Sequence, residues 1–181
     1  MLFFDFTIDM GWRPAASLDT LRRRAQLLAD IRAFLGARGV LEVDTELLGP
    51  APSSDPQQHC LEVTLPGGAR RYLQPSPEYA MKRLLAAGSG SIYQVCKAFR
   101  AGEDGSRHRT EFTLVEWYRL GLGYRALMDE VSALVCGLLD RLPAQAFSYG
   151  ELFECHTGLD PLAATDDELW QRVALACRPA S

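Results

Sequence analysis

Residues 91–118 read SIYQVCKAFRAGEDGSRHRTEFTLVEWY, and this stretch decides the fold. Apolar and polar side chains alternate over residues 91–99 and again over residues 111–118, which is the period-2 pattern of β-strands. The intervening residues 100–110 are polar and charged, with two glycines and no apolar side chain larger than alanine. The pattern therefore predicts a long antiparallel hairpin with a charged tip.

Helix signals lie on both sides of this hairpin. Ser17 is a predicted N-cap for an amphipathic helix that ends at Gly39 as a C-cap glycine. Residues 76–78 (Ser-Pro-Glu) have the serine cap, the early proline and the first-turn acid of a helix start. A further helix is predicted over residues 124–142, and its apolar face is formed by Leu127, Val131, Leu134, Val135, Leu138 and Leu139.

Shorter elements complete the pattern. Helices that alternate with antiparallel strands predict an α+β domain. The remaining predicted elements are a strand over residues 40–43, a loop over 45–56, a hairpin from the β-prone runs 60–65 and 70–73, a helix over 149–157 closed by Gly158, and a helix opened by the capping box of Thr165 and Glu168.

The composition is that of an ordinary globular domain. The chain has 181 residues, 48% of them apolar and 23% charged, which excludes collagen, coiled coils and bulk disorder. Its five cysteines are widely spaced without a C-x-x-C pair, so neither a zinc site nor a disulfide framework is predicted. No basic residue precedes Arg13 and no apolar run approaches the roughly 20 residues of a membrane span. We therefore expect a cytoplasmic protein with no membrane partner.

Charge is unevenly distributed along the chain. The net charge of −4 argues against a general nucleic-acid coat. Residues 67–110 nevertheless carry eight basic and three acidic side chains, whereas residues 140–181 carry three basic and seven acidic ones. The middle segment is thus the predicted place for an anionic ligand, with a solvated basic face as the alternative.

The predicted hairpin also carries chemically useful side chains. Arg100, at the end of its first strand, presents a planar fork of donors that suits phosphate oxygens. Side chains of like parity on neighbouring antiparallel strands share a face, so Glu116 and Tyr118 are expected to face the same cleft as Glu111 or its neighbours. Carboxylates there suit Mg²⁺ or a substrate ammonium group, although we assign no residue as a dedicated metal ligand.

Three segments in this order resemble a known family. The hairpin contains Phe-Arg at 99–100 and then His-x-x-Glu-Phe-Thr-x-x-Glu-x-Tyr from residue 108, which looks like motif 2 of the class II aminoacyl-tRNA synthetases in its lysyl version. Residues 76–85 are similar to the amino-acid-binding segment of that family, and residues 39–50 resemble motif 1. Within the family, the sequences of residues 12–17, 76–79 and 116–119 resemble those of the paralogues that attach β-lysine to elongation factor P. The resemblance covers about residues 12–162.

The resemblance implies a role for each candidate site residue. Arg100 would act as the catalytic residue by holding both the α-phosphate of ATP and the substrate carboxylate. Around the nucleotide, Glu103 would contact the adenine amino group, His108 the terminal phosphates, and Phe112 the adenine ring. Arg109 stands where the family usually has asparagine, so it either lacks that nucleotide contact or serves the phosphates. The amino-acid pocket would be lined by Ser76, Glu78, Glu116 and Tyr118.

The same resemblance implies a two-step reaction that uses ATP and Mg²⁺. The carboxylate of lysine or β-lysine attacks the α-phosphate, pyrophosphate leaves, and the adenylate then passes to an acceptor amine. Barely sixteen residues precede the first helix, which leaves no room for an anticodon-binding barrel, so a lysine of elongation factor P is the expected acceptor and tRNA is not. The implied fold is an antiparallel sheet flanked by helices, in a homodimer formed through the Ser17–Arg38 helix and the Gly49-Pro50 region.

The end of the chain departs from the family pattern. Nothing after Leu162 resembles the glycine-rich motif 3, so we divide the chain into an extension (1–16), the front part of a catalytic domain (17–162) and a short tail (163–181). We expect such a truncated domain to be inactive alone in ATP–pyrophosphate exchange. The alternatives are a non-catalytic remnant or fragment that acts as a dimeric or nucleotide-binding module, and a fragment of a lysyl-tRNA synthetase core.

Overall fold

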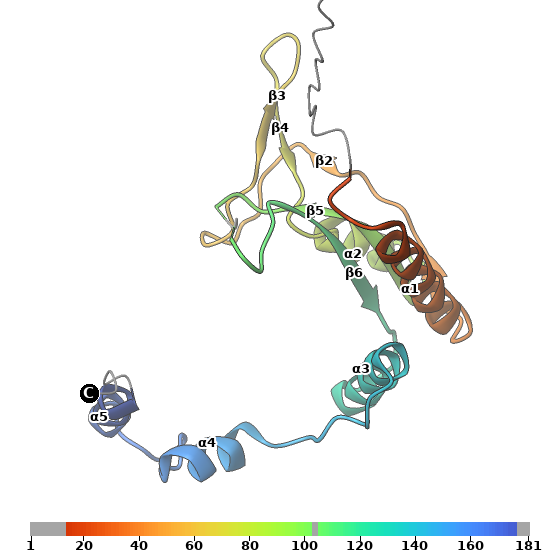
Figure 1. Ribbon diagram of the computed structural model, residues 1–181. Coiled ribbons are helices and arrows are strands. Elements are labelled where there is room, and N and C mark those ends of the chain that lie inside the picture. Colours follow the sequence, from red (N-terminus) through yellow and green to blue (C-terminus); the bar gives the residue numbers. More distant parts are fainter. Residues whose placement is uncertain (1–13, 103–104, 177–181) are drawn as a thin grey trace, which may run out of the picture. The chain divides into compact units, whose positions relative to one another are not determined.

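The computed structural model describes residues 14–102 and 105–176 (Figure 1). The chain divides into two compact units, Met1–Leu139 and Asp140–Ser181. No helix formed by the described residues is both long enough and apolar enough to span a membrane.

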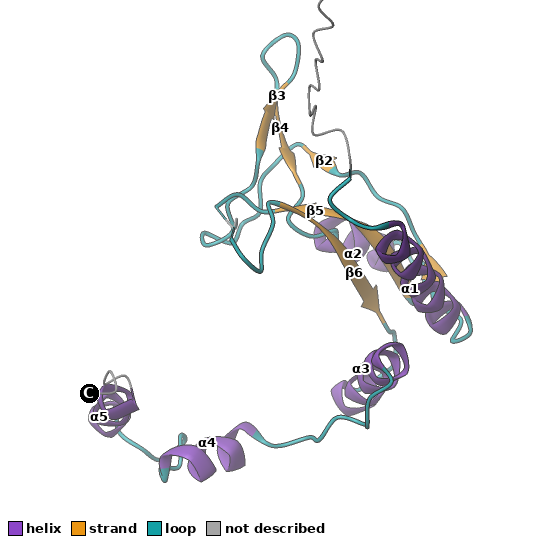
Figure 2. Cartoon of the chain, in the orientation of Figure 1, coloured by secondary structure: helices purple, strands orange, loops and turns teal. Residues whose placement is uncertain are grey.

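The first unit is an α+β arrangement with two small sheets (Figure 2). One sheet has the strand order β1-β5-β6 and the other β2-β4-β3. The elements of this unit are α1 (Leu18–Gly36), β1 (Leu41–Glu42), β2 (Leu48–Gly49), β3 (Glu62–Thr64), β4 (Arg70–Leu73), α2 (Glu78–Ala86), β5 (Ile92–Phe99), β6 (Glu111–Tyr118) and α3 (Tyr124–Leu139).

The β5–β6 hairpin confirms the prediction made from residues 91–118. The two strands pair antiparallel without a break, from Ile92 opposite Tyr118 to Phe99 opposite Glu111. On its other edge β5 pairs with β1 in the parallel direction, with Leu41 opposite Ile92. The expected antiparallel sheet is therefore a mixed one, because the chain crosses from β1 to β5 through residues 43–91, which include α2, rather than through a hairpin.

Helix α1 begins and ends as predicted. The Ser17 side chain accepts a hydrogen bond from the backbone N–H of Thr20, which confirms the N-cap. The helical residues run to Gly36, and Gly39 closes the helix in the left-handed conformation (φ 69°). The backbone N–H of Gly39 donates to the Gly36 carbonyl and that of Val40 to the Leu35 carbonyl, which is the pattern of a C-terminal glycine cap.

The loop predicted over residues 45–56 contains a short strand that the sequence did not reveal. Strand β2 pairs antiparallel with β4, with Leu48 opposite Leu73. On its other side β4 pairs with β3, which confirms the predicted hairpin of residues 60–65 and 70–73. Two residues are too few to show a period-2 pattern, so only the tertiary pairing defines β2.

The core of the first unit lies between α1, β5 and α3. Its buried members are Ile31, Leu35, Val40, Tyr93 and Leu134, and Trp117 packs against them. Figure 1 shows α1 beside the hairpin strands. The predicted apolar face of α3 was partly wrong, since Leu134 is buried and Leu138 packs against the core, while the exposed members are Val131, Val135 and Leu139.

A buried carboxylate connects the three elements around this core. Glu130 of α3 is 9% exposed, and its side chain accepts a hydrogen bond from the indole N–H of Trp117 at 3.1 Å. Its other oxygen lies 3.4 Å from Nε of Arg119 and 3.9 Å from Nε of Arg38. Arg119 also donates to the backbone carbonyl of Arg38. The network thus joins α3, the end of β6 and the turn after α1.

The second unit contains α4 (Tyr149–Thr157) and α5 (Asp166–Ala176). Helix α4 ends at Gly158 in the left-handed conformation, as predicted. It starts with a capping box between Ser148 and Glu151, which was not predicted from the sequence. The predicted capping box of α5 is confirmed by reciprocal hydrogen bonds between Thr165 and Glu168.

We expect Glu130→Ala to lower the free energy of unfolding by about 3 kcal/mol, because it leaves a buried indole donor and two guanidinium groups without their shared carboxylate. Urea denaturation followed by circular dichroism measures this loss. The matched control is Asp129→Ala at the exposed neighbouring position, for which a change within about 0.5 kcal/mol is expected. Equal losses in the two variants would show that the network does not stabilise the fold.

Candidate functional site

The register of the hairpin sorts the predicted site residues onto faces. Phe112, Glu116 and Tyr118 lie opposite Ala98, Gln94 and Ile92, and they share one face of the sheet because their numbers differ by even amounts. Glu111 lies on the opposite face, where its carboxylate pairs with Lys97 at 2.7 Å. Of the two alternatives expected to share a face with Glu116 and Tyr118, Glu111 or its neighbours, the structure selects the neighbour Phe112.

Glu116 is the hub of this face. One of its carboxylate oxygens accepts a hydrogen bond from the Ser76 hydroxyl at 2.7 Å, and the other accepts from the Tyr118 hydroxyl at 2.6 Å. Ser76 also accepts a hydrogen bond from the backbone N–H of Glu78. The structure thus brings together all four residues predicted for the amino-acid pocket, although they come from segments about 40 positions apart.

The start of α2 differs from the prediction in its cap. Pro77, not Ser76, occupies the N-cap position, and α2 begins at Glu78. The backbone of Pro77 (φ −76°, ψ 3°) is already near the helical region, so the preceding serine stands outside the helix. Its hydroxyl is engaged by Glu116, which links the first turn of α2 to β6. The Glu78 side chain pairs with Lys82 one turn later.

Burial and negative charge hold Tyr118 in its protonated form. Desolvation raises the pKa of the Tyr118 phenol, and the hydrogen bond to Glu116 and the charges of Glu116 and Glu78 raise it further. Each cause acts in the same direction because phenol ionisation would place a new anion in a half-buried, negatively charged setting. Tyr118 is therefore a hydrogen-bond donor at neutral pH and not a general base.

Arg100 continues the hairpin beyond the last residue of β5. Its backbone N–H donates to the carbonyl of Thr110 at 2.9 Å, which extends the strand pairing into the tip. Its guanidinium carbon lies 5.1 Å from the centroid of the Phe112 ring, within the range of cation–π attraction. The structure thus brings Arg100 and Phe112 together, with one face of the ring turned to the cation.

The other predicted nucleotide contacts fall on the tip of the hairpin. Glu103 lies outside the described residues. His108 and Arg109 are exposed, and the tip is held by a hydrogen bond from Gly105 N–H to the His108 carbonyl and another from Arg109 to the Gly105 carbonyl. These two side chains remain predictions for a phosphate contact.

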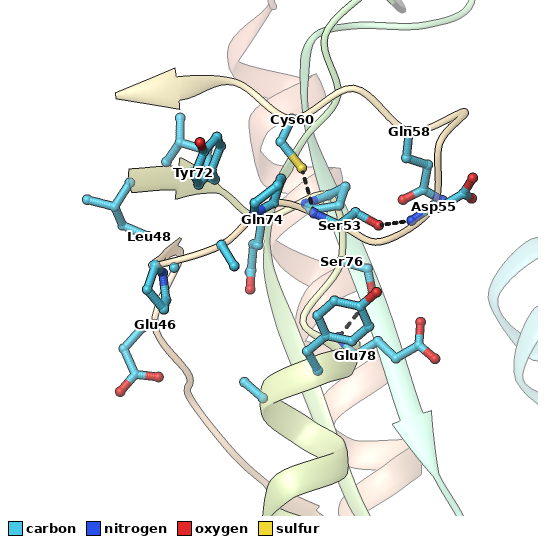
Figure 3. A pocket seen from close by; sticks show the side chains of 18 of the residues that line it. Glu46, Leu48, Ser53, Asp55, Gln58, Cys60, Tyr72, Gln74, Ser76 and Glu78 are labelled. Atoms are coloured by element: carbon cyan, nitrogen blue, oxygen red, sulfur yellow. Dashed lines mark hydrogen bonds between the residues drawn. The ribbon is translucent and has the colours of Figure 1, made fainter. Parts of the chain in front are cut away.

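A cavity of about 550 Å³ lies beside the Glu116 hub (Figure 3). Ser76 and Glu78 line it, together with residues predicted from the sequence to form a connecting loop. The missed residues that line the cavity are Glu46, Ser53, Asp55, Gln58, Cys60 and Tyr79. A segment rich in glycine and proline, such as residues 49–56, indicates that a loop is present. No local sequence pattern shows that this loop forms a wall of the cavity.

The described residues do not assemble a metal centre by themselves. No group of three or more histidine, cysteine, aspartate or glutamate side chains is placed to hold an ion in the described ranges 14–102 and 105–176. Mg²⁺ usually takes only one or two carboxylates and otherwise binds water and substrate phosphates. We therefore derive no step of the chemistry through Mg²⁺.

A comparison with protein families identifies the family of this chain. Residues 7–168 match the family model of the class II tRNA synthetases (D, K and N). The chain belongs to the class II tRNA synthetase family. The first unit, with the crossover from β1 to β5 and the β5–β6 hairpin, is the part of this synthetase domain that carries the candidate site.

Curated relatives of this synthetase-family chain have one name in common. The "Elongation factor P--(R)-beta-lysine ligase" of Pseudoalteromonas translucida is 47% identical over 92% of the chain, and those of Salmonella gallinarum and Avibacterium paragallinarum are 43% and 41% identical over 90% and 92%. The matches cover 52%, 52% and 53% of those proteins. The chain thus spans about half the length of the curated relatives it matches.

We expect Glu116→Gln to lower the pKa of Tyr118 because it removes the neighbouring negative charge, while burial keeps the pKa above the ordinary value of about 10. In the native protein the folded-state pKa lies above the unfolded value, so the neutral phenol stabilises the fold at neutral pH. That contribution is lost as the pH rises above about 10. A pH titration of ¹³C-labelled tyrosines by NMR measures the shift, with Tyr118→Phe to assign the signal.

The matched control is Glu111→Gln, which removes the same charge from the opposite face of β6. It is expected to leave the pKa of Tyr118 unchanged. If Tyr118 titrates with the same pKa in the native protein and in Glu116→Gln, the proposed interaction between Glu116 and Tyr118 is wrong.

Proposed function

We propose that this chain provides the ATP- and amino-acid-binding part of a ligase that activates lysine or β-lysine as an adenylate and transfers it to a lysine of elongation factor P. The observation that carries the proposal is the Glu116 hub, in which Ser76 and Tyr118 fix a carboxylate on the hairpin face that also holds Arg100. The names of the relatives support the same acceptor.

The first step needs little from the protein besides positioning. The substrate carboxylate is itself the nucleophile: its oxygen forms a bond to the α-phosphorus of ATP, the bond to the bridging oxygen breaks, and pyrophosphate leaves. Because no proton has to be removed, catalysis rests on orientation and on stabilisation of negative charge. In this proposal Arg100 binds the α-phosphate and the carboxylate, and Phe112, which already stacks on Arg100, takes the adenine ring on its other face.

The remaining nucleotide contacts belong to the tip of the hairpin. Glu103 would bind the adenine amino group, and His108 and Arg109 the terminal phosphates. Class II synthetase-like ligases use ATP together with Mg²⁺, and Mg²⁺ would join the chain's residues only through those phosphates.

The amino-acid end of the proposed site is negatively charged. Glu116 and Glu78 offer carboxylates for a substrate ammonium group, and the protonated Tyr118 holds one oxygen of Glu116 in place. Lys82 pairs with Glu78, and no cation in the described part of the chain forms an ion pair with Glu116. A cationic substrate group therefore suits this pocket.

The assembly and location that we propose follow the family. A homodimer would form through α1 and the Gly49-Pro50 region, in keeping with the exposed apolar side chains Leu18, Leu21 and Leu27 on α1. The acceptor would be elongation factor P and not tRNA, and the compartment the cytoplasm.

A second candidate function is a non-catalytic module that binds nucleotide or forms the dimer without making adenylate, and a fragment of a lysyl-tRNA synthetase core is a variant of it. The observation that favours it is the coverage of about half the length of the relatives. The ligase part and a nucleotide-binding module both predict ATP binding that requires Arg100, and only the ligase part also predicts binding of lysine.

We expect Arg100→Ala to weaken ATP binding by at least about tenfold, because charge-assisted hydrogen bonds to phosphate are worth roughly 1.5–3 kcal/mol. Isothermal titration calorimetry with ATP measures the affinity, and a second titration with lysine separates the two candidates, because only the ligase part binds the amino acid. The matched control is Arg107→Ala, an exposed arginine of the tip to which no role is assigned. If Arg100→Ala and Arg107→Ala bind ATP equally well, the proposed nucleotide site is wrong.

A further inference from the structure

The cavity beside the Glu116 hub adjoins the proposed amino-acid pocket, and most of its lining residues have no role in the proposed function. Ser76 and Glu78 line it, whereas Glu116 and Tyr118 do not. Its volume of about 550 Å³ falls within the range of small-ligand sites in proteins.

One wall of the cavity is a loop that is held in place by its own hydrogen bonds. The backbone N–H of Ser53 donates to Sγ of Cys60, and that of Asp55 donates to the Ser53 hydroxyl. The Ser54 hydroxyl and backbone N–H both bond to the Tyr79 hydroxyl, which ties the loop to α2. The cavity is thus preformed and does not need a ligand to fold its wall.

The two sides of the cavity differ in chemistry. In Figure 3, Leu48 and Tyr72 lie on one side, and Asp55, Gln58 and Ser76 lie on the other. Further apolar groups line the cavity, namely Pro50, Ala51, Pro52, Leu73, Pro75 and Ala80. A ligand that fits must therefore combine an aliphatic part with a polar end.

The charges of the lining favour a cationic end. Three carboxylates line the cavity, and Arg83 is the one basic residue among the lining residues. Glu78 is compensated by Lys82, whereas Glu46 and Asp55 form no ion pair with any residue that the structure describes. A primary ammonium on an aliphatic stem satisfies both the apolar wall and these carboxylates.

We propose that this cavity binds a lysine side chain presented by a polypeptide, and that it is the acceptor-lysine site of the proposed ligase. The inference rests on the proposed function for its role, although not for the binding itself. A peptide-bonded lysine brings only its ammonium into the cavity, whereas a free amino acid would also place its α-carboxylate among the unpaired carboxylates. The four-carbon stem lies against Leu48 and Tyr72, and the ammonium points to Asp55.

Because the cavity lies next to Ser76 of the proposed amino-acid pocket, a lysine bound in it can take part in the transfer step. After the ammonium loses a proton to water, the amine nitrogen forms a bond to the acyl carbon of the adenylate. The bond from that carbon to the phosphate oxygen breaks, AMP leaves with the electron pair, and the second amine proton is released to water. An amide is the product, and no oxidant or reductant is needed.

The test is an NMR titration of the ¹⁵N-labelled 181-residue chain with Nα-acetyl-lysine N-methylamide, which has the ammonium but no carboxylate. We expect saturable shifts at the backbone signals of Ser53, Asp55, Cys60 and Tyr79. Nα-acetyl-norleucine N-methylamide, which keeps the aliphatic stem and lacks the charge, is expected to produce none. Asp55→Asn is expected to weaken binding of the lysine probe about fivefold, the size of one partly exposed ion pair.

The matched control is Asp30→Asn, the same change at an exposed position of α1 outside the cavity lining. Three results would each overturn the proposal. The lysine probe produces no saturable shifts, the norleucine probe produces equal shifts, or Asp55→Asn and Asp30→Asn weaken binding of the lysine probe equally. Shifts of the same signals on concentrating the chain without probe would also overturn it, since a second copy would then occupy the cavity. ATP binding is measured on the same samples. If the chain binds the lysine probe but does not bind ATP, the ligase assignment is wrong and the lysine site is retained.

Discussion

The uninterrupted register of β5 against β6 is the constraint on which the rest of the structure depends. Side chains alternate between the faces of a strand, so pairing Ile92 with Tyr118 assigns every residue of the hairpin to one side. One face supplies Tyr93 and Trp117 to the core with α1 and α3. The other face supplies Glu116 and Tyr118 to the candidate site. A slip of one residue would exchange the two sets, burying the carboxylate and exposing the core.

Core and site are therefore stabilised by the same element. The Glu130 network lies next to Trp117 at one end of β6, and the Glu116 hub lies one residue away on the opposite face. Each gives a buried or half-buried carboxylate side-chain donors, which offset the cost of removing it from water. The strand pairing that holds the fold thus also places Glu116 and Tyr118 beside Ser76 and puts Arg100 and Phe112 on the same face of the hairpin.

Local patterns predicted the elements well wherever they were long or capped. The hairpin strands, the Ser17 cap, the Gly158 stop and the Thr165 box all follow from interactions within a few residues, and all are confirmed. The predictions failed where a distant partner decides. The two-residue strand β2 exists only because β4 pairs with it, and the hydrogen bond that Ser76 donates to Glu116 joins positions 40 residues apart.

By itself the sequence determined the family and the residues that can carry its chemistry, because the spacing of motif residues along a hairpin can be read directly from their positions in the sequence. It also placed the four amino-acid-pocket residues in two separate segments without showing how they meet. Only the tertiary structure decided that Ser76 meets Glu116, that Glu111 turns away from the site, and that residues 46–60 form the wall of a cavity with two unpaired carboxylates among the described residues. These features depend on contacts between segments far apart in the chain, which no periodicity encodes.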